Sequence, residues 1–320
     1  MTPEVSVIIP TYNRCAMLHE AIDSVFAQSI ASFELIVIDD GSTDGTAEHL
    51  TRPEVWFPFP QGKGLGVRSP AYPSLQFERI EHRGPAAARN CGVAIARAPL
   101  IAFLDSDDLW SPTKLERQLA FVRANPARAI SQSNEIWIRN GRRVNPGVRH
   151  RKRGGDIFIE SLRTCLISMS ATMMRTDLFR SAGGFDEIMT AAEDYDLWLR
   201  ILIDDEAGLL DEPLVTRRGG HRDQASATTP AIDRFRILAL TKLLADERLS
   251  PARRIAAVEV LAEKCRIYAG GLKRRGKIDE ARLYEWIADR AHSWQSSADT
   301  EIGCAIKSMR SMLREVSHEC

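Results

Sequence analysis

Short apolar runs alternate with segments of helical spacing through the first 110 residues. Four of these runs are typical of buried strands: 5–9, 33–38, 75–81 and 100–104. Between the first two, apolar side chains fall on one face of a helix: Leu18, Ile22, Val25 and Phe26. An alanine-rich segment, 86–97, predicts a helix before the last of these strands. This alternation predicts right-handed βαβ crossovers and an α/β fold with a Rossmann-like, mostly parallel sheet flanked by helices.

The next hundred residues extend this pattern with further strands. Asn140-Gly141 is a tight-turn signal, and it separates two predicted strands, 129–139 and 142–144. Apolar runs predict two more strands, 165–174 and 208–216. Helices are expected at 112–125, near 177–181 before the glycine pair Gly183-Gly184, and from Glu193 onward. Asn13 and Ser111 stand where an N-cap would begin the helices that follow them.

Two stretches depart from the strand and helix alternation. Residues 52–74 are rich in proline and glycine and show no period; they include a GxGxG at 62–66, which predicts a loop. From about residue 230 the apolar spacing becomes helical throughout, and 268–284 resembles one helix-turn-helix of tetratricopeptide type. We therefore expect a catalytic domain over 1–229, with halves at about 1–110 and 111–229, and a helical appendage over 230–320.

Composition narrows the classes of function. Lysine plus arginine equals aspartate plus glutamate at 43 each, so no global basic field favours nucleic acid. The six cysteines are scattered and show no CxxC pair, which is typical of reduced thiols. No leader peptide or bilayer-length apolar run is visible. We expect a cytoplasmic protein, and a peripheral contact of the C-terminal helices with the inner face of the membrane or with another protein stays open.

The strongest candidate site follows the strand at 100–104. Asp105, Asp107 and Asp108 stand within four positions, and ligands bind beyond the carboxyl ends of strands in open α/β sheets. If the chain stays extended, Asp105 and Asp107 point to the same side, where two carboxylates suit Mg²⁺ or Mn²⁺. The alternative is that these acids are solvated or cap the next helix, although Ser111 and Pro112 already supply capping residues there.

Two other charged clusters have structural and functional interpretations. The acids that open the helix at Glu193 could complement the helix dipole or carry chemistry. The basic run 149–153 predicts a solvated loop, with contact to an anionic acceptor or a phosphate as the alternative.

Six ordered motifs together resemble the inverting family-2 glycosyltransferases with the GT-A fold. They cover roughly residues 4–225: VSVIIPTYNR (5–14), DDGSTD (39–44), GPAAARN (84–90), FLDSDDLW (103–110), GGFD (183–186) and EDYD (193–196). The resemblance implies a nucleotide-sugar donor, a UDP-sugar before others, and a saccharide, lipid-linked or other hydroxyl acceptor in the synthesis of surface polysaccharide or glycoconjugate. Its implied cofactor is Mn²⁺ or Mg²⁺.

The resemblance also assigns roles to individual residues. Asp194 would be the general base, and Asp107 a direct metal ligand, with Asp105 beside the metal and the ribose and His221 a further metal candidate. The remaining nucleotide-binding candidates are Pro10, Thr11, Tyr12, Asp39, Asp40, Arg83, Arg89 and Ser106. The acceptor-side candidates are Asp186, Glu193 and Trp198.

The mechanism implied by this resemblance is a single displacement. The departing nucleoside diphosphate gains negative charge that a cation neutralises, while one carboxylate takes the proton of the attacking hydroxyl. A nucleotidyltransferase or an oxidoreductase would need a glycine-rich loop after the first strand, and residues 10–14 contain no glycine. A catalytically weak nucleotide-binding or scaffold protein acting through its C-terminal helices stays as the alternative.

Overall fold

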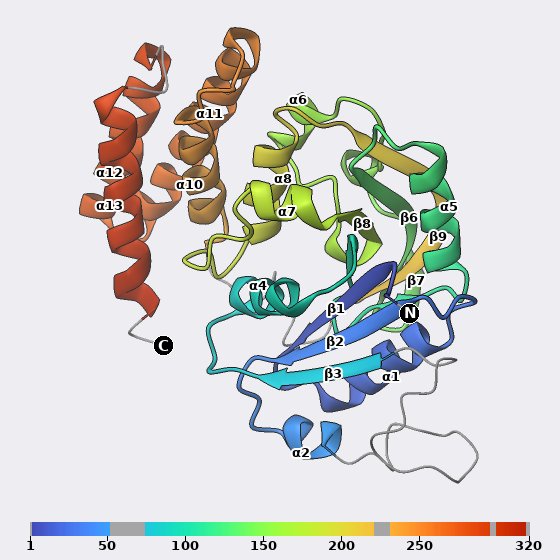
Figure 1. Cartoon of the computed structure of the whole chain (residues 1–320). Helices are drawn as coiled ribbons and strands as arrows, with labels where there is room; N and C mark the ends of the chain where they lie inside the picture. The colour runs from blue at the N-terminus through green and yellow to red at the C-terminus, as the bar shows by residue number, and fades with distance from the viewer. Residues whose placement is uncertain (1, 52–73, 221–230, 295–298, 318–320) are drawn as a thin grey trace, which may run out of the picture. The chain divides into compact units, whose positions relative to one another are not determined.

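The structure is a computed structural model that describes residues 2–51, 74–220, 231–294 and 299–317 (Figure 1). The chain forms two compact units, each assembled from separate parts of the sequence. The first unit comprises Met1–Gly155, Ile167–Glu187 and Asp205–Arg222. The second comprises Asp156–Leu166, Ile188–Asp204 and Asp223–Cys320. The segment 52–73, which includes the GxGxG, and the candidate His221 lie outside the described residues.

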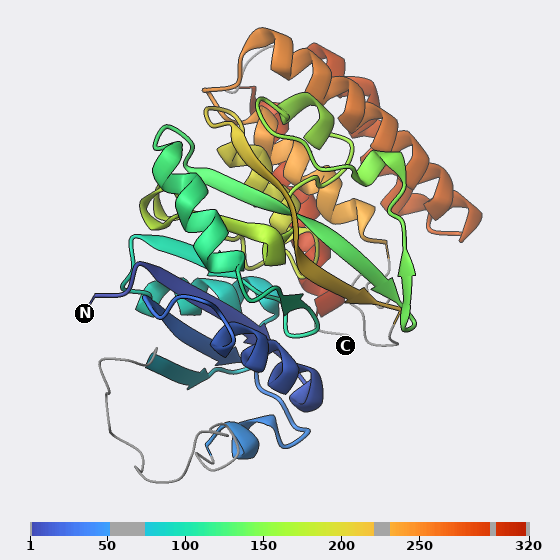
Figure 2. The ribbon, with the colours of Figure 1, turned by 90° about the vertical axis from the view of Figure 1, so that its right-hand side faces the viewer.

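The first unit is built on a mixed sheet, which in the described residues has nine strands in the order β3-β2-β1-β4-β8-β6-β9-β5, with β7 beside β6. Their bounds are β1 Val5–Thr11, β2 Phe33–Asp39, β3 Ser74–Arg79, β4 Leu100–Phe103, β5 Leu109–Trp110, β6 Ile130–Arg139, β7 Arg142–Val144, β8 Thr172–Arg175 and β9 Ala207–Gly219. β3, β2, β1 and β4 pair in parallel, and β8 joins β4 antiparallel. Figure 2 shows the long strands β6 (green) and β9 (gold) side by side.

Helices cover both faces of the β1–β3 region, and α1 and α4 lie on opposite sides of it (Figure 1). The helices of this unit are α1 Cys15–Phe26, α2 Thr46–Leu50, α4 Pro85–Ile95, α5 Lys114–Ala124 and α7 Thr176–Ser181. The apolar stripe of α1 packs into a core with alternate residues of β1 and β2, as its spacing predicts. On the other face, α4 approaches β1 so closely that a Cβ on Gly92 would lie 2.5 Å from Ile8 Cγ2. The α/β prediction is confirmed.

One buried carboxylate ties the amino ends of the strands together. Glu34 in β2 is inaccessible to solvent and accepts a hydrogen bond of 2.7 Å from the Ser6 hydroxyl. It also accepts two hydrogen bonds of 2.8 Å from Arg97, one from the backbone N–H and one from Nε. Although burial alone would raise the pKa of Glu34, these hydrogen bonds hold it below its ordinary value.

Several local predictions are wrong for identifiable reasons. Asn13 does not cap α1, because its side chain accepts a hydrogen bond of 2.7 Å from the backbone N–H of Thr43 instead. Ser111 is not the cap of α5, which begins after Thr113. The strand expected at 165–174 is confined to β8, because residues 169–171 form a 3₁₀ turn. Lys152, expected in a solvated basic loop, is buried.

The second unit is helical, as expected for the C-terminal region. Its helices are α6 Phe158–Ser161, α8 Glu193–Ile201, α10 Asp233–Leu244, α11 Pro251–Arg274, α12 Ile278–Arg290 and α13 Thr300–Ser317. α11 and α12 pack against each other across a short turn in which Gly276 has a φ of 75°. Among the described helices, none has the length and apolar character to span a lipid bilayer.

Candidate functional site

The order of the parallel strands reverses between β1 and β4. β2 and β3 follow β1 on one side, whereas β4 lies on its other side, with Val5 opposite Leu100 and Ile8 opposite Phe103. In open α/β sheets the crevice beyond such a reversal is where ligands bind. Residues 11–14 and 104–108 leave the sheet at this point, which brings the predicted nucleotide and metal segments together.

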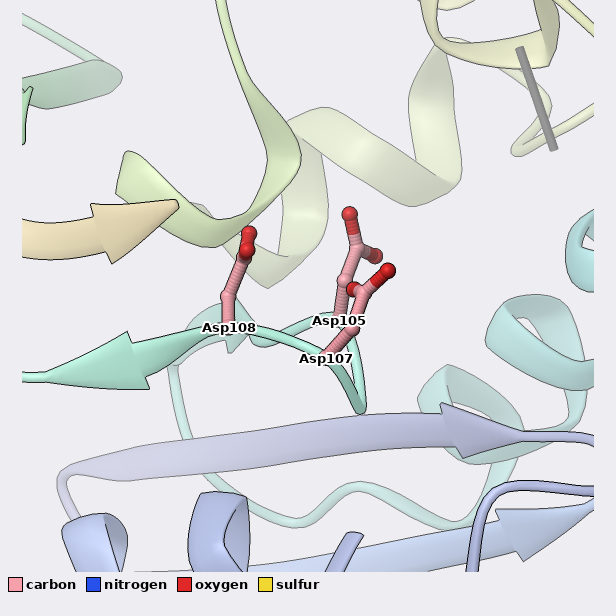
Figure 3. A group of neighbouring side chains, drawn as sticks. All are labelled: Asp105, Asp107 and Asp108. Carbon is pink, nitrogen blue, oxygen red and sulfur yellow. The ribbon is translucent and has the colours of Figure 1, made fainter. Parts of the chain in front are cut away.

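The three aspartates after β4 are gathered by a tight turn. The backbone N–H of Asp108 donates to the carbonyl of Asp105 at 2.9 Å, so the chain turns where the sequence argument assumed an extended segment. One carboxylate oxygen from each of Asp105, Asp107 and Asp108 lies within 4.8 Å of the others. Figure 3 shows the three side chains on the same side of this turn. The expected clustering of the acids is therefore confirmed, and a turn produces it.

Two arginines compensate the charge of two of these acids. Arg89, from α4, contacts Asp105 Oδ1 at 2.7 Å, and Arg14, which precedes α1, contacts Asp107 Oδ2 at 2.7 Å. The Asp105 side chain remains 34% exposed and that of Asp107 13% exposed, so both carboxylates are accessible. Arg14 was not recognised from the sequence, because its contact with Asp107 joins residues 93 positions apart.

Asp108 differs from its neighbours because its carboxylate is committed to the protein. It is buried, and its two oxygens accept hydrogen bonds from the Ser170 hydroxyl at 2.6 Å and from the backbone N–H of Arg218 at 2.9 Å. Burial, followed by the charges of Asp107 and Asp105, raises the pKa of Asp108 well above its ordinary value. Asp108 therefore anchors the turn to distant segments of the first unit.

The donor set of this turn fits a hard divalent cation. Asp105 and Asp107 supply carboxylate oxygens that are accessible and close together, and Mg²⁺ and Mn²⁺ prefer such ligands together with water and phosphate oxygens. Ser106, between them, is buried in the turn.

A second group of predicted residues lies at the carboxyl ends of β1 and β2. Asp40 is buried and accepts hydrogen bonds of 2.8 Å from the backbone N–H groups of Arg83 and Gly84. Its carboxylate also lies 2.9 Å from His82 Nδ1. Burial raises the pKa of Asp40, and these partners offset only part of that effect. Asp39 is also buried, and it accepts a hydrogen bond from the backbone N–H of Ser42.

Tyr12 presents an aromatic ring beside this group. The ring is 41% exposed and stacks on His82, with centroids 3.9 Å apart and planes inclined by 18°. Pro10 and Thr11, which precede it, are the last residues of β1 and are buried. Arg83 has a largely exposed side chain that pairs with Glu187, next to the half-buried Asp186. His82 was not among the predicted site residues, and its place in the sequence before Gly84-Pro85 was the available signal.

The remaining candidates belong to the second unit, at the start of α8. Asp194 is half-buried, accepts from the backbone N–H of Tyr195 at 2.7 Å, and lies 3.5 Å from Cys165 Sγ. Among the described residues, no lysine, arginine or histidine lies within 4 Å of its carboxylate. Asp196, by contrast, is buried and pairs with both Arg200 and Lys242. The acids of this helix therefore divide into a structural carboxylate and a chemically available one.

Glu193 and Trp198 are both buried within the second unit. Glu193 is 7% exposed, and Trp198 is 2% exposed and among the largest buried side chains. The spacing that placed Trp198 on the inner face of the helix agrees with this burial.

Comparison with known proteins places the sequence within a family. The profile of glycosyl transferase family 2 matches residues 6–182. An uncharacterized glycosyltransferase of Rickettsia felis is 34% identical over 211 residues, which are 66% of this chain and 32% of the relative. The match thus spans about a third of that relative's length. WfgD of Escherichia coli, a UDP-Glc:alpha-D-GlcNAc-diphosphoundecaprenol beta-1,3-glucosyltransferase, is 31% identical over 207 residues, 65% of this chain and 73% of its own.

Solved structures show the same fold at low sequence identity. Residues 1–349 of Staphylococcus aureus TarS in complex with UDP superpose with a TM-score of 0.62 at 17% identity, covering 98% of this chain and 92% of that one. The mannosyltransferase PcManGT of Pyrobaculum calidifontis, in complex with GDP-Man and Mn²⁺, gives a TM-score of 0.54 at 18% identity, covering 93% and 86%. With the family profile matching more than half of its length, this chain belongs to glycosyl transferase family 2 and has a GT-A fold.

Proposed function

We propose that this chain transfers a sugar from a UDP-sugar to the hydroxyl group of a saccharide acceptor, with inversion and with the help of a divalent cation. The observation that carries the proposal is the pair of accessible carboxylates, Asp105 and Asp107, at the strand-order reversal between β1 and β4. The printed ligands of two TarS structures, UDP and UDP-GlcNAc, support the choice of donor. The name of WfgD supports a lipid-linked sugar as acceptor and a role in polysaccharide or glycoconjugate synthesis.

The donor nucleotide would bind at the carboxyl ends of β1 and β2. Tyr12 offers one exposed ring face for the base, since its other face stacks on His82. Asp40, held by two backbone N–H groups, is fixed in place to accept a hydrogen bond from the base. Further nucleotide contacts are assigned to the neighbouring Pro10, Thr11, Asp39, Arg83, Arg89, Asp105 and Ser106.

Asp107 and Asp105 would hold Mn²⁺ or Mg²⁺ together with the donor diphosphate. The cation supplies neutralisation of the charge that accumulates on the departing diphosphate. Arg14 and Arg89 already contact these carboxylates, so both guanidinium groups are close enough to turn toward phosphate oxygens when a cation takes their place. His221 is retained as a further metal candidate.

Asp194 would accept the proton of the attacking hydroxyl. Its carboxylate has no basic partner among the described residues, so its lone pairs are not consumed by an ion pair as those of Asp196 are. A single base with no second carboxylate nucleophile implies one displacement, and therefore inversion at the anomeric carbon. Asp186 and Glu193 are proposed on the acceptor side, whereas the burial of Trp198 supports a packing role.

The nucleotide and metal parts of the proposal are tested by thermal denaturation with UDP or GDP, each with and without Mn²⁺. We expect UDP with Mn²⁺ to raise the melting temperature, because a ligand at 100 times its Kd stabilises the folded state by about 2.7 kcal/mol. Asp107→Ala should remove the Mn²⁺-dependent part of the increase. Asp279→Asn, in an exposed ion pair on α12, is the matched control and should behave as wild type.

The catalytic assignment is tested by slow hydrolysis of a UDP-sugar and by transfer once an acceptor is known. Asp194→Asn should lower kcat for transfer by about 100-fold or more while UDP binding is retained. Full activity in Asp194→Asn would refute its role. Absence of any nucleotide binding would instead favour a scaffold function through the C-terminal helices.

A further inference from the structure

A pocket of about 270 Å³ lies in the first unit, between β6 and the segment 146–152. Its walls include Asn134, Trp137, His150 and Arg151, and the pair Glu135 and Lys152 lies at its base. The residues assigned above to the donor, the metal and the base do not line it. The volume is at the lower end of the range of about 300–1,000 Å³ found for small-molecule sites. A single sugar ring therefore fits this pocket better than a whole nucleotide-sugar.

The base of the pocket is rigid. Lys152 Nζ donates to Gln132 Oε1 at 3.1 Å and to Ser168 Oγ at 2.9 Å, and it lies 3.1 Å from Glu135 Oε1. Although burial alone would raise the pKa of Glu135, the charge of Lys152 and then that of Arg217 hold it below its ordinary value. This buried ion pair fixes the segment 146–152 against β6. Because the hydrogens of Lys152 are already used, other groups must contact a ligand.

Trp137 forms an apolar wall that is held in one orientation. Its Nε1 donates to Glu135 Oε2 at 2.8 Å, the Arg217 guanidinium lies over the ring at 5.1 Å, and the His150 ring lies 5.4 Å away at 47°. The indole is therefore positioned before any ligand arrives. A fixed aromatic surface beside polar groups suits the apolar C–H face of a pyranose, whose hydroxyls remain at the edge.

The surroundings of the pocket carry uncompensated positive charge. Four exposed arginines line the β6–β7 hairpin and the pocket mouth, and none has a carboxylate within 4 Å among the described residues: Arg139, Arg142, Arg143 and Arg151. Elsewhere in the same unit, Arg117, Arg123 and Arg128 each pair with a glutamate. In a chain of zero formal net charge, this concentration gives the pocket a locally positive potential.

We propose that this pocket binds a sugar unit that bears an anionic group, a phosphate or a carboxylate, with the ring against Trp137 and the anion at Arg151. Calling this sugar part of the acceptor rests on the proposed transferase function. The binding itself does not, because the pocket, its charge and its aromatic wall are independent of the donor residues.

Binding is tested with the full-length protein in a chelating buffer, by following tryptophan indole N–H resonances during titration with glucose 1-phosphate, glucuronic acid, glucose or inorganic phosphate. The Trp137 resonance is identified by its loss in Trp137→Phe. We expect both acidic sugars to shift this resonance at concentrations about tenfold lower than glucose, and added salt to weaken the effect. Arg151→Ala should raise the Kd for glucose 1-phosphate about tenfold, as loss of one charge-assisted hydrogen bond predicts.

Arg123→Ala, which removes an exposed arginine on α5, is the control and should bind as wild type. Equal affinity for glucose would refute the anionic requirement, and equal affinity for inorganic phosphate would refute the sugar. Binding to anionic lipid vesicles without a response to either acidic sugar would overturn the proposal in favour of a membrane contact. Failure of the proposed transferase would appear separately, as absence of UDP binding with the Trp137 response intact.

Discussion

Lys114 offers a quantitative test of how the first unit is stabilised. Its side chain is fully buried on α5, and its Nζ lies 3.5 Å from the centroid of the Trp110 ring. In the part of the chain that the structure describes, the nitrogen has no hydrogen-bond partner. Burial lowers the pKa of Lys114 well below its ordinary value of 10.5. We predict that Lys114→Met, which keeps the volume and removes the amine, stabilises the protein at neutral pH.

The magnitude follows from proton linkage. If the folded state holds the amine neutral, each pH unit below 10.5 adds about 1.4 kcal/mol to the cost of folding, or about 5 kcal/mol at pH 7. A cation–π contact with Trp110 favours the charged form by about 2 kcal/mol, which is less than this desolvation cost. The methionine variant loses that contact, so the net gain at pH 7 should be about 2–3 kcal/mol.

The sign of the pH dependence separates this explanation from simple repacking. The unfolded state binds more protons than the folded state between the folded pKa and 10.5, so wild-type stability should rise with pH in that interval. Urea unfolding at pH 7 and pH 9.5 measures this, and the advantage of Lys114→Met should shrink by about 3 kcal/mol at the higher pH. A variant that is less stable than wild type at both pH values would refute the reasoning.

Three further predictions concern other parts of the first unit. Gly92→Ala places a Cβ 2.5 Å from Ile8 Cγ2, so it should lower the free energy of unfolding by about 1–3 kcal/mol in urea titrations; an unchanged midpoint would show that β1 can yield. Because hydrogen bonds hold the pKa of Glu34 below 4.5, its stabilisation is present above that pH and is lost as the pH falls through the folded-state value; Glu34→Gln should therefore destabilise at pH 7 by about 1–2 kcal/mol and much less at pH 3. Arg14→Ala removes a cation 2.7 Å from Asp107, so nucleotide-free protein should bind Mn²⁺ several-fold more tightly in calorimetry; weaker binding would show that the arginine positions the carboxylate.

The sequence predicted features that depend on local periodicity. The strands before Thr11 and Asp105, the helix that contains Asp194 and the tight turn at Asn140 were recoverable, because apolar spacing and turn residues record them directly. The clustering of the acids followed from their place after a strand, since parallel strands end at a common edge.

The features that were missed depend on contacts between distant residues. The commitment of Asp108 requires Ser170 and Arg218, which lie 62 and 110 positions away. The burial of Lys152 depends on partners on β6 and in the 167–171 segment, so its basic neighbours in the sequence gave a misleading picture. No local pattern distinguishes a buried aspartate or lysine from a solvated one when the partner that decides it is supplied by the fold.

The arginine partners of Asp105 and Asp107 have a practical consequence. Since Arg89 and Arg14 already supply counter-charge from within the polypeptide, the turn after β4 can form before any ion is present. Purification in EDTA should then yield intact, correctly assembled enzyme whose catalysis is switched off and returns when manganese is added back.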